Sequence, residues 1–539
     1  MNVSRETSSS LLDLSLDPTV RDAAQSDHTA PAPLVGEGKG EGSPVSAGNV
    51  SRETSSSLPD PSLAAAIRDA AQSDRSAPSP LVGEGKGEGS RRSRRRRIAL
   101  PALARAVGAI LVAACGAPPG PQGWAAPAPI KLDNAKVVLV PHKAKLYALP
   151  DGSSTELWEF PPKDKNTYPV STETRDNLKA ALADAGLDDA ARKPIAQKID
   201  ELKVSGPTAA DLKTAITNTG ASVDAKDRLK KAIDDKVGSE KKSFDGLKAL
   251  YGDLGVSADS KTAFVSTFKG ELFALDTATG QTRWIHDAGA GMVGGVAVDG
   301  DAIYFGTKGK RVFALDAKSA RQLWQFDTKG EIWATPAVDG GTVFVTSLDG
   351  SVYALDKASG QKKWVFNGAG SGIAARPVVS GDAVYVGSFD NKLYSIKTAD
   401  GALNWSLNAD NWFWASPVVQ GNVVYAAALD GKVYAVDASS GQAAWPKPFD
   451  TGAAIRSSPV IAGDALIVAS RNGKVFKLGL QNGDPSEGSP VTLAGTSILS
   501  NLTLGGDNTV LVSPTSSALF IFDASRSALE APGNVPLPQ

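Results

Sequence analysis

The sequence contains one cysteine, Cys115, three histidines and two methionines among its 539 residues. A single thiol excludes an intramolecular disulfide and any zinc site built from several cysteines. So few histidines also disfavour metal centres and catalytic machinery that depend on imidazole. Any chemistry would therefore rest on carboxylates, arginine, lysine or a bound cofactor.

Charge of one sign is also missing, because 57 Lys and Arg residues balance 58 Asp and Glu residues, which leaves a formal net charge of −1. Such a chain has no overall field that attracts nucleic acid, and we expect no nucleic-acid partner. Aromatic residues make up only 6% of the sequence, whereas glycine is abundant, with 54 residues. This composition suits a turn-rich, all-β fold.

Apolar residues are scarce at the start of the chain. The segment Val3–Ser43 returns with few changes as Val50–Ser90, and Ser, Gly, Pro and charged residues dominate both copies. Too little apolar surface is present to offset the entropy lost on folding, so we expect residues 1–90 to be disordered. The alternative is that translation starts downstream of Met1 and that this duplicated segment is translated repetitive DNA.

Residues 91–115 resemble a secretory signal. Several arginines precede the apolar stretch Ile98–Ala114, which Arg105 interrupts and which is short for a bilayer span. The stretch ends in LVAAC, which resembles a bacterial lipobox, in which the cysteine is lipidated and becomes the mature N-terminus. We therefore predict lipidation of Cys115, with an ordinary signal peptide as the alternative. Residues 116–129, rich in Pro, Gly and Ala, are the predicted tether.

Tryptophan recurs about every 40 residues along the rest of the chain, within phrases such as LFALDTATGQTRW and VYALDKASGQKKW. Between residues 335 and 366, four short β-branched runs (TPAV, TVFVTS, SVYALD, KKWVF) alternate with turn dipeptides. Four strands in about 40 residues are typical of one β-propeller blade. We expect each indole to pack across the seam between two blades. These structural docking residues are Trp158, Trp284, Trp324, Trp364, Trp405 and Trp445.

Eight central hairpins lie between residues 136 and 523. They predict an all-β, eight-bladed β-propeller, with seven blades as the alternative. We assign residues 130–161 to the first repeat and residues 253–539 to the others. The last repeat lacks a clear fourth strand after Asp523, so we expect Ile130–Asn134 to supply it and to close the ring.

Residues 162–252 form an insertion between the first and second repeats. Apolar residues recur there at steps of three and four, as in Leu178–Leu182 and Ile195–Ile199, which predicts four or five short amphipathic helices. We expect N-caps at Thr208 and Asp224 and helix ends near Gly186, Gly220 and Gly238. A spacer or lid and a partner-docking module are both open as roles for this small helical domain.

The repeated phrase resembles the tryptophan-docking motif of the pyrroloquinoline-quinone-type propeller repeat, YALDxxTGxxxW. Enzymes with this repeat are quinoprotein dehydrogenases, and the resemblance implies adjacent cysteines and carboxylates that hold calcium beside a quinone. This sequence has no adjacent cysteines. Its repeated aspartates keep a fixed distance from each tryptophan, which assigns them to turns; they are Asp276, Asp316, Asp356 and Asp437. We therefore expect no catalytic residues, no metal and no cofactor.

One position varies informatively between repeats. Alignment on the proline of TPAV, RPVV, SPVV and SPVI places Trp333, Ala374, Trp414 and Arg456 at equivalent sites near the innermost strand. Large indoles and guanidinium groups near a central funnel suit a binding surface, whereas packing that plugs the channel is the alternative. The candidate binding residues are Trp333, Arg376, Trp412, Trp414 and Arg456.

As a whole, the chain resembles the propeller lipoprotein subunit of the outer-membrane β-barrel assembly machinery. That resemblance implies a non-catalytic extracytoplasmic scaffold that binds protein partners in the cell envelope and is lipid-anchored to the cell membrane or the outer membrane. A ligand-binding or sensory propeller, for a quinone or a glycan, is the alternative. A quinoprotein oxidoreductase ranks third.

Overall fold

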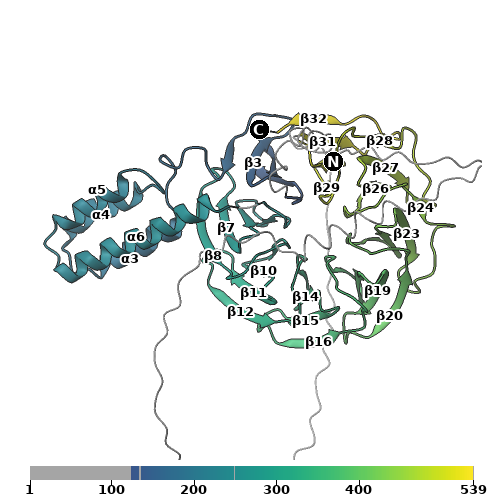
Figure 1. Ribbon diagram of the computed structural model, residues 1–539, viewed down its shortest axis with the longest axis horizontal. Helices are drawn as coiled ribbons and strands as arrows, with labels where there is room; N and C mark the ends of the chain where they lie inside the picture. Colours follow the sequence, from purple (N-terminus) through teal and green to yellow (C-terminus); the bar gives the residue numbers. More distant parts are fainter. Residues whose placement is uncertain (1–122, 133–134, 248, 517, 538–539) are drawn as a thin grey trace, which may run out of the picture. The chain divides into compact units, whose positions relative to one another are not determined.

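The computed structural model describes residues 123–132, 135–247, 249–516 and 518–537. Eight four-stranded antiparallel sheets follow one another along this part of the chain, and Figure 1 shows them arranged around a central axis. The predicted eight-bladed β-propeller is confirmed, and the seven-bladed alternative is wrong. Residues 1–90 and the signal segment with Cys115 lie outside the described residues.

The first four blades run from the innermost to the outermost strand in chain order. Blade 1 contains β1 (Ala128–Leu132), β2 (Ala135–His142), β3 (Lys145–Pro150) and β4 (Trp158–Phe160). Blade 2 contains β5 (Gly255–Val256), β6 (Thr262–Ser266), β7 (Glu271–Asp276) and β8 (Thr282–Asp287). Blade 3 contains β9 (Ala297–Asp299), β10 (Ala302–Gly306), β11 (Arg311–Asp316) and β12 (Gln322–Asp327). Blade 4 contains β13 (Ala337–Asp339), β14 (Thr342–Thr346), β15 (Val352–Asp356) and β16 (Lys362–Phe366).

The other four blades repeat the same order. Blade 5 contains β17 (Val378–Ser380), β18 (Ala383–Gly387), β19 (Lys392–Lys397) and β20 (Leu403–Asn408). Blade 6 contains β21 (Val418–Gln420), β22 (Val423–Ala427), β23 (Lys432–Asp437) and β24 (Phe449–Asp450). Blade 7 contains β25 (Val460–Ala462), β26 (Ala465–Ala469), β27 (Lys474–Gly479) and β28 (Val491–Thr492). Blade 8 contains β29 (Thr503–Leu504), β30 (Thr509–Val512), β31 (Ala518–Asp523) and β32 (Gly533–Pro536).

The ring closes without any exchange of strands between its ends. Strand β1 pairs with β2 in its own blade, and β32 pairs with β31 as the fourth strand of blade 8. The prediction that Ile130–Asn134 completes the last blade is therefore wrong. Strand β32 gives no clear sequence signal because only Val535 of its four residues is buried. Blades 1 and 8 instead meet through side chains, among them Val138, Tyr147 and Leu519.

The recurring indoles join each of the first six blades to the next one. In blade 3, Nε1 of Trp324 donates a hydrogen bond of 2.9 Å to the carbonyl oxygen of Lys357 in blade 4. The other five docking tryptophans make the same bond to the following blade. Burying one indole removes roughly 150–250 Å² from water, an upper limit of about 4–6 kcal/mol each. A periodic tryptophan therefore stabilises every seam that it spans.

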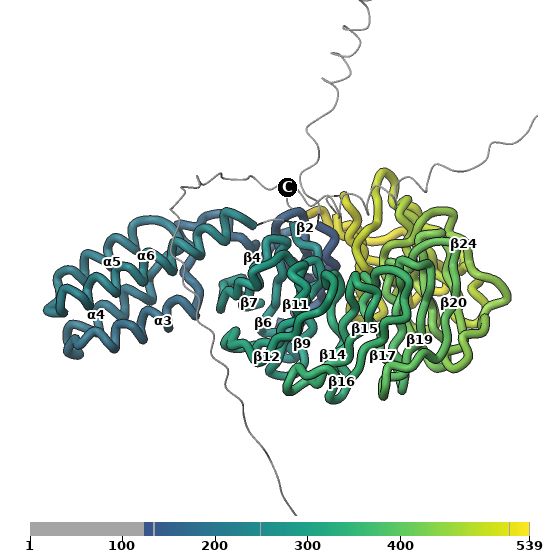
Figure 2. Tube along the Cα trace, turned by 60° about the horizontal axis from the view of Figure 1, so that its bottom comes forward, coloured from purple at the N-terminus to yellow at the C-terminus, as the bar shows by residue number. Residues whose placement is uncertain are grey.

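In the described part of the chain the insertion contains four helices. They are α3 (Thr172–Ala183), α4 (Asp189–Asp200), α5 (Thr208–Thr217) and α6 (Val223–Asp245), and Figure 2 shows them lying alongside one another. Ser171, Asp188 and Ser222 accept the N-cap hydrogen bonds of α3, α4 and α6. No described helix combines the length and the apolar character that a bilayer crossing requires.

Three of the expected helix boundaries were wrong. Helix α5 begins at Thr208 itself, after Pro207, and makes no side-chain cap. Ser222 caps α6, and Asp224 lies in its first turn, where a carboxylate favours the helix dipole. Gly238 lies inside α6 because the buried face of this helix continues past it to Phe244.

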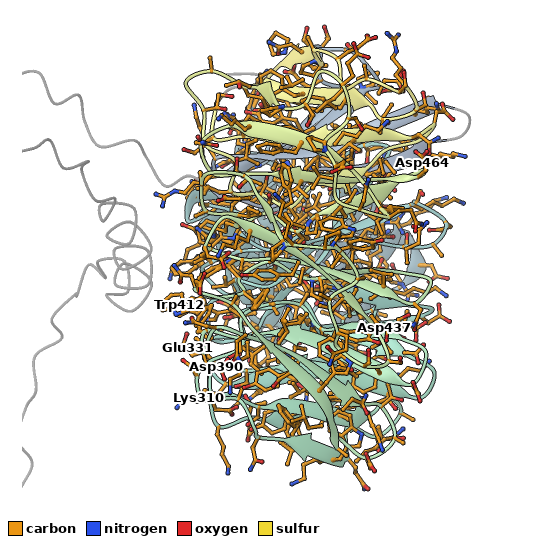
Figure 3. The ribbon with its side chains drawn as sticks, turned by 90° about the vertical axis from the view of Figure 1, so that its right-hand side faces the viewer. Lys310, Glu331, Asp390, Trp412, Asp437 and Asp464 are labelled. Carbon is orange, nitrogen blue, oxygen red and sulfur yellow. The ribbon has the colours of Figure 1, made fainter. Side chains whose placement is uncertain are left out.

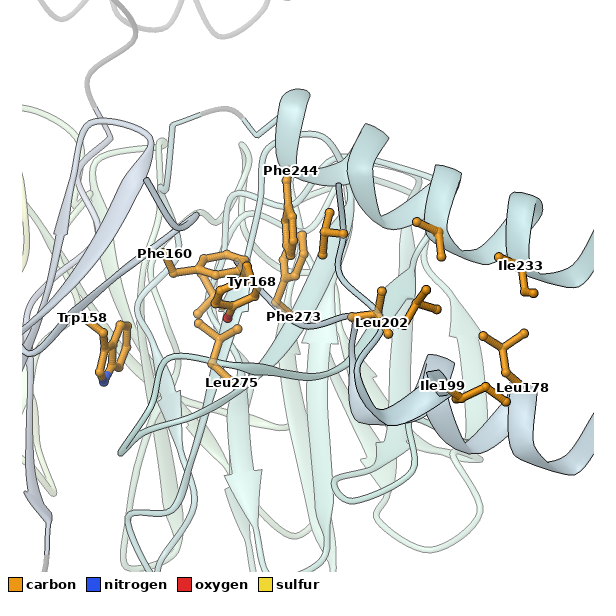
Figure 4. Packing of buried hydrophobic residues seen from close by; sticks show 14 of the residues in the cluster. Trp158, Phe160, Tyr168, Leu178, Ile199, Leu202, Ile233, Phe244, Phe273 and Leu275 are labelled. Carbon is orange, nitrogen blue, oxygen red and sulfur yellow. The ribbon is translucent and has the colours of Figure 1, made fainter. Parts of the chain in front are cut away.

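The helical domain shares one hydrophobic core with blades 1 and 2. The ring of Phe160 in β4 lies 5.5 Å from Phe244 in α6 and 4.9 Å from Phe273 in β7, and Figure 4 shows these side chains together. The Tyr168 hydroxyl donates to the carbonyl oxygen of Gly280, and Glu173 in α3 accepts from the backbone N–H of Ile285 in β8 at 3.3 Å. Helix α3 thus covers the outer edge strand of blade 2.

Candidate functional site

The eight blades contribute one residue each to a ring around the axis, which we call the inner ring. Trp333, Trp414 and Arg456, three of the candidate binding residues, belong to it. A single cavity of about 70 Å³, the axial cavity, is lined by all eight members and by Arg376. The inner ring consists of Trp124, Tyr251, Val293, Trp333, Ala374, Trp414, Arg456 and Leu499.

Two residues after the inner-ring member, five of the eight blades carry a polar side chain that accepts a hydrogen bond from the preceding blade, whereas Ala126, Gly295 and Arg376 stand at this position in the other three. The backbone N–H groups of Arg376, Ser416 and Ser458 each donate to a side-chain oxygen of the next blade, at 3.0 Å. Asn501 accepts the last of these bonds and donates from Nδ2 to Asp253 at 2.9 Å. Ser, Thr, Asn or Asp recurs at this position because it supplies the acceptor.

Arg376 interrupts this belt of hydrogen bonds. A guanidinium group has only donors, so it cannot accept the backbone N–H of the preceding blade. The side chain of Arg376 is exposed, and within the described residues it makes no hydrogen bond or ion pair. It therefore leaves a free positive charge beside the axial cavity.

Three aromatic side chains stack in series at one face of the propeller, and we call Phe389, Trp412 and Trp414 the aromatic platform. The ring of Phe389 lies 4.7 Å from Trp412 and 5.2 Å from Trp414, with nearly parallel planes in both pairs. All three residues are partly exposed. Figure 3 shows Trp412 on the same face as Glu331, whereas Asp464 lies on the opposite face.

Trp333 has a different environment from the platform. Only 6% of its surface is exposed, its ring lies 6.4 Å from Trp414, and its Nε1 donates to Glu331 at 2.8 Å. An indole that is buried and hydrogen-bonded in this way packs the axis. The structure thus places Trp333 beside the other candidates but leaves little of it accessible to a partner.

Arg456 lies between two indoles of the inner ring. Its Cζ atom is 4.1 Å from the ring of Trp124 and 4.2 Å from the ring of Trp414, a cation–π contact with each indole. Burial, together with the positive charge of Arg471, lowers the pKa of Arg456 to about 10. The guanidinium group still carries its charge at neutral pH.

The described residues around the axis do not form a cluster of metal ligands. No three His, Cys, Asp or Glu side chains in the described ranges come together to hold a metal ion. Asp253 lines the axial cavity, but both of its oxygens accept protein hydrogen bonds. The repeated aspartates accept backbone N–H bonds inside their own turns, as Asp276 does from Ala278 and Thr279.

Sequence reasoning missed the centre of the platform and four members of the inner ring, which are Trp124, Tyr251, Val293 and Leu499. Trp124 begins the phrase WAAP, which repeats WATP at Trp333 and could have been aligned with it. It lies in the segment assigned to the tether, so blade 1 begins before residue 130. Tyr251 lies at the end of the segment assigned to the insertion, and a leucine, three residues after it, takes the place of the aligned proline. Phe389 precedes a turn and carries no repeat signal.

Comparison with known proteins gives a family match within the propeller. The model of the outer membrane protein assembly factor BamB matches residues 268–376 and 366–532. The crystal structure of BamB from Moraxella catarrhalis is 25% identical, with a TM-score of 0.44, and the match covers 51% of this chain and 82% of that one. The computationally designed Ika8 protein is 15% identical, with a TM-score of 0.46, and the match covers 51% and 83% of the two chains.

No curated protein matches the chain. The repeated docking motif, the eight four-stranded blades and the family match nevertheless agree with one another. The chain is a pyrroloquinoline-quinone-type β-propeller repeat protein that resembles the outer membrane protein assembly factor BamB.

Proposed function

We propose that this protein is a non-catalytic, extracytoplasmic scaffold that binds a protein partner at the face carrying the aromatic platform. Its role would lie in the assembly of envelope proteins, as the name of the matched family suggests. A lipid on Cys115 would hold it at the membrane. The observation that carries the proposal is the stack of three partly exposed aromatic rings, Phe389, Trp412 and Trp414.

Stacked aromatic rings at a surface are the usual centre of a protein interface. Indoles supply a large apolar area with few rotamers to order, and Trp and Arg are enriched among the residues that dominate binding energy. Polar residues flank the platform along the chain, since Asp390 directly follows Phe389 and Asp410 lies two residues before Trp412. The docking tryptophans are at most 9% exposed, so the platform is a second, distinct use of aromatic residues.

The proposal is tested by affinity capture from detergent-solubilised membranes of the native organism. Trp412→Ala should reduce recovery of the co-purified partner at least tenfold, because it removes the outer ring of the platform. The melting temperature should change by less than about 2 °C, since Trp412 is partly exposed. The matched control is Leu403→Ala, which removes an exposed apolar residue from β20 and should leave recovery unchanged. Equal recovery with wild type and Trp412→Ala would contradict the proposal.

A further inference from the structure

The guanidinium group of Arg456 is the least satisfied charged group near the axis. Its Nε and Nη2 atoms are buried and have no hydrogen-bond partner among the described residues. Buried donors are nearly always paired, and a buried charge without a counter-ion is unfavourable. The two indoles make cation–π contacts with this guanidinium group, and such contacts supply no hydrogen-bond acceptor for Nε and Nη2.

The two unpartnered atoms form one geometric unit. Nε–H and one Nη2–H of an arginine point in the same direction, as a fork that matches the two oxygens of a carboxylate. The carboxylate of Asp253, which lines the same cavity, already accepts hydrogen bonds from Ala126 and Asn501, and among the described residues it makes no ion pair with Arg376 or Arg456. Within the part of the chain that the structure describes, this buried fork therefore has no acceptor.

The surroundings favour an anion over any other ligand. Arg376 lines the same axial cavity with an exposed guanidinium group, and Arg471 is close enough for its positive charge to lower the pKa of Arg456. Positive charge is thus concentrated at the axis of a chain whose formal net charge is −1. The cavity of about 70 Å³ has room for a few water molecules, and hence for a carboxylate group but not for an aromatic ring.

We propose that the axial cavity binds a carboxylate of the partner polypeptide, with the Nε and Nη2 fork of Arg456 as the donor pair and Arg376 as a second positive charge. This inference rests on the proposed function, because the polypeptide would arrive over the aromatic platform. Trp414 links the two features: it stacks on Phe389 and on Arg456. A residue packed on the platform would place a neighbouring carboxylate at the cavity.

The test uses the full chain and two probes that differ in one group, acetyl-Gly-Gly-Phe with a free carboxylate and the same tripeptide as its carboxamide. Binding is followed by tryptophan fluorescence, since two indoles contact Arg456. The free acid should bind at least tenfold more tightly than the amide. Arg456→Met should abolish this preference, and Arg376→Gln should reduce it about threefold. The control Arg311→Gln, at an arginine that pairs with Asp327 instead, should leave it unchanged.

Stability separates a ligand site from a packing role. Arg456→Met replaces an unpaired buried charge by an apolar side chain of similar length, so the melting temperature should stay the same or rise. The proposal would be overturned if Arg456→Met lowered the melting temperature, Arg456→Lys kept the wild-type melting temperature, and the wild type showed no preference for the acid. Equal affinity for acid and amide would also overturn it. Binding of sulfate without binding of either tripeptide would overturn it too, because it would indicate a site for a small free anion only.

Membrane capture distinguishes this inference from the proposed function. If Trp412→Ala abolishes recovery of the partner while Arg456→Met retains it fully, the scaffold function stands and the carboxylate site falls. If neither variant changes recovery, the proposed function itself fails. Loss of recovery with both variants, together with the preference for the free acid, supports both.

Discussion

Beneath most docking indoles, the next blade turns through a glycine with positive φ. Gly360 has φ +71°, and a Cβ atom built there would lie 2.6 Å from the ring of Trp324. Blade 3 departs from this rule, because Ala320 occupies the position under Trp284 with φ +57°. The turn of blade 3 therefore contains an alanine in a left-handed conformation, which disfavours residues other than glycine.

This exception predicts opposite effects for two reciprocal substitutions. The left-handed conformation costs alanine about 1–2 kcal/mol in the folded protein. This exceeds the roughly 0.4–1 kcal/mol of stability that is lost with glycine because its unfolded chain has more conformational entropy. Ala320→Gly should therefore raise the free energy of unfolding by about 0.5 kcal/mol. Gly360→Ala should lower it by about 2 kcal/mol or more, because strain and the close contact with Trp324 add. Chemical denaturation measures both, and destabilisation by Ala320→Gly would contradict this account of the seam.

In the helical domain, Glu240 carries a buried carboxyl group. It accepts hydrogen bonds from the backbone N–H and the hydroxyl of Ser171 and from the hydroxyl of Thr174. Burial nevertheless raises the pKa of Glu240 above its ordinary value of 4.5. The folded chain therefore binds this proton more tightly than the unfolded chain, and stability falls as the pH rises from 4.5 through the raised pKa.

Glu240→Gln removes this titration. We expect the melting temperature of the wild type to fall relative to that of the variant as the pH rises above 4.5, and the two curves to run parallel once the pH exceeds the raised pKa. Differential scanning fluorimetry across a pH series measures the difference. A difference that stays constant across this series would show that Glu240 has the same pKa in the folded and the unfolded chain, which would contradict the raised pKa.

At the scale of elements, the sequence pattern was most informative where one residue type served one purpose in every repeat. The docking tryptophans and the β-branched runs predicted blades because each blade must cover the face of its neighbour. The prediction failed at β32, where a single buried residue, Val535, defines the strand. The platform residue Phe389 was invisible for the opposite reason: its role depends on stacking with Trp412 and Trp414 from the next blade.

The seam itself can be tested by comparing two tryptophans with different roles. Trp324→Ala should lower the free energy of unfolding by about 3–5 kcal/mol, because it leaves a cavity between blades 3 and 4 and an unpaired carbonyl oxygen on Lys357. Trp412→Ala should cost less than about 1 kcal/mol, since this indole lies partly exposed on the platform. Equal losses in chemical denaturation would contradict the division between docking and platform tryptophans.

At the scale of the whole molecule, the described chain is a closed ring of eight blades. A helical domain projects from its outer edge and shares a hydrophobic core with blades 1 and 2. Phe244 of α6 contacts both Phe160 and Phe273, which are fully buried, so the insertion stabilises blades 1 and 2 and covers the edge of β8. The two faces of the ring differ in character. One carries Trp412 of the aromatic platform together with Lys310, Glu331 and Asp390, whereas the other carries Asp437 and Asp464 (Figure 3).

The central claim is that the partner binds at the platform face, and site-specific photo-crosslinking in native membranes tests it most directly. A photoreactive phenylalanine analogue in place of Trp412 should form a covalent adduct with a distinct envelope polypeptide. The same analogue in place of the exposed Asp464, on the opposite face, should form none. Adducts from position 464 and none from position 412 would contradict the account.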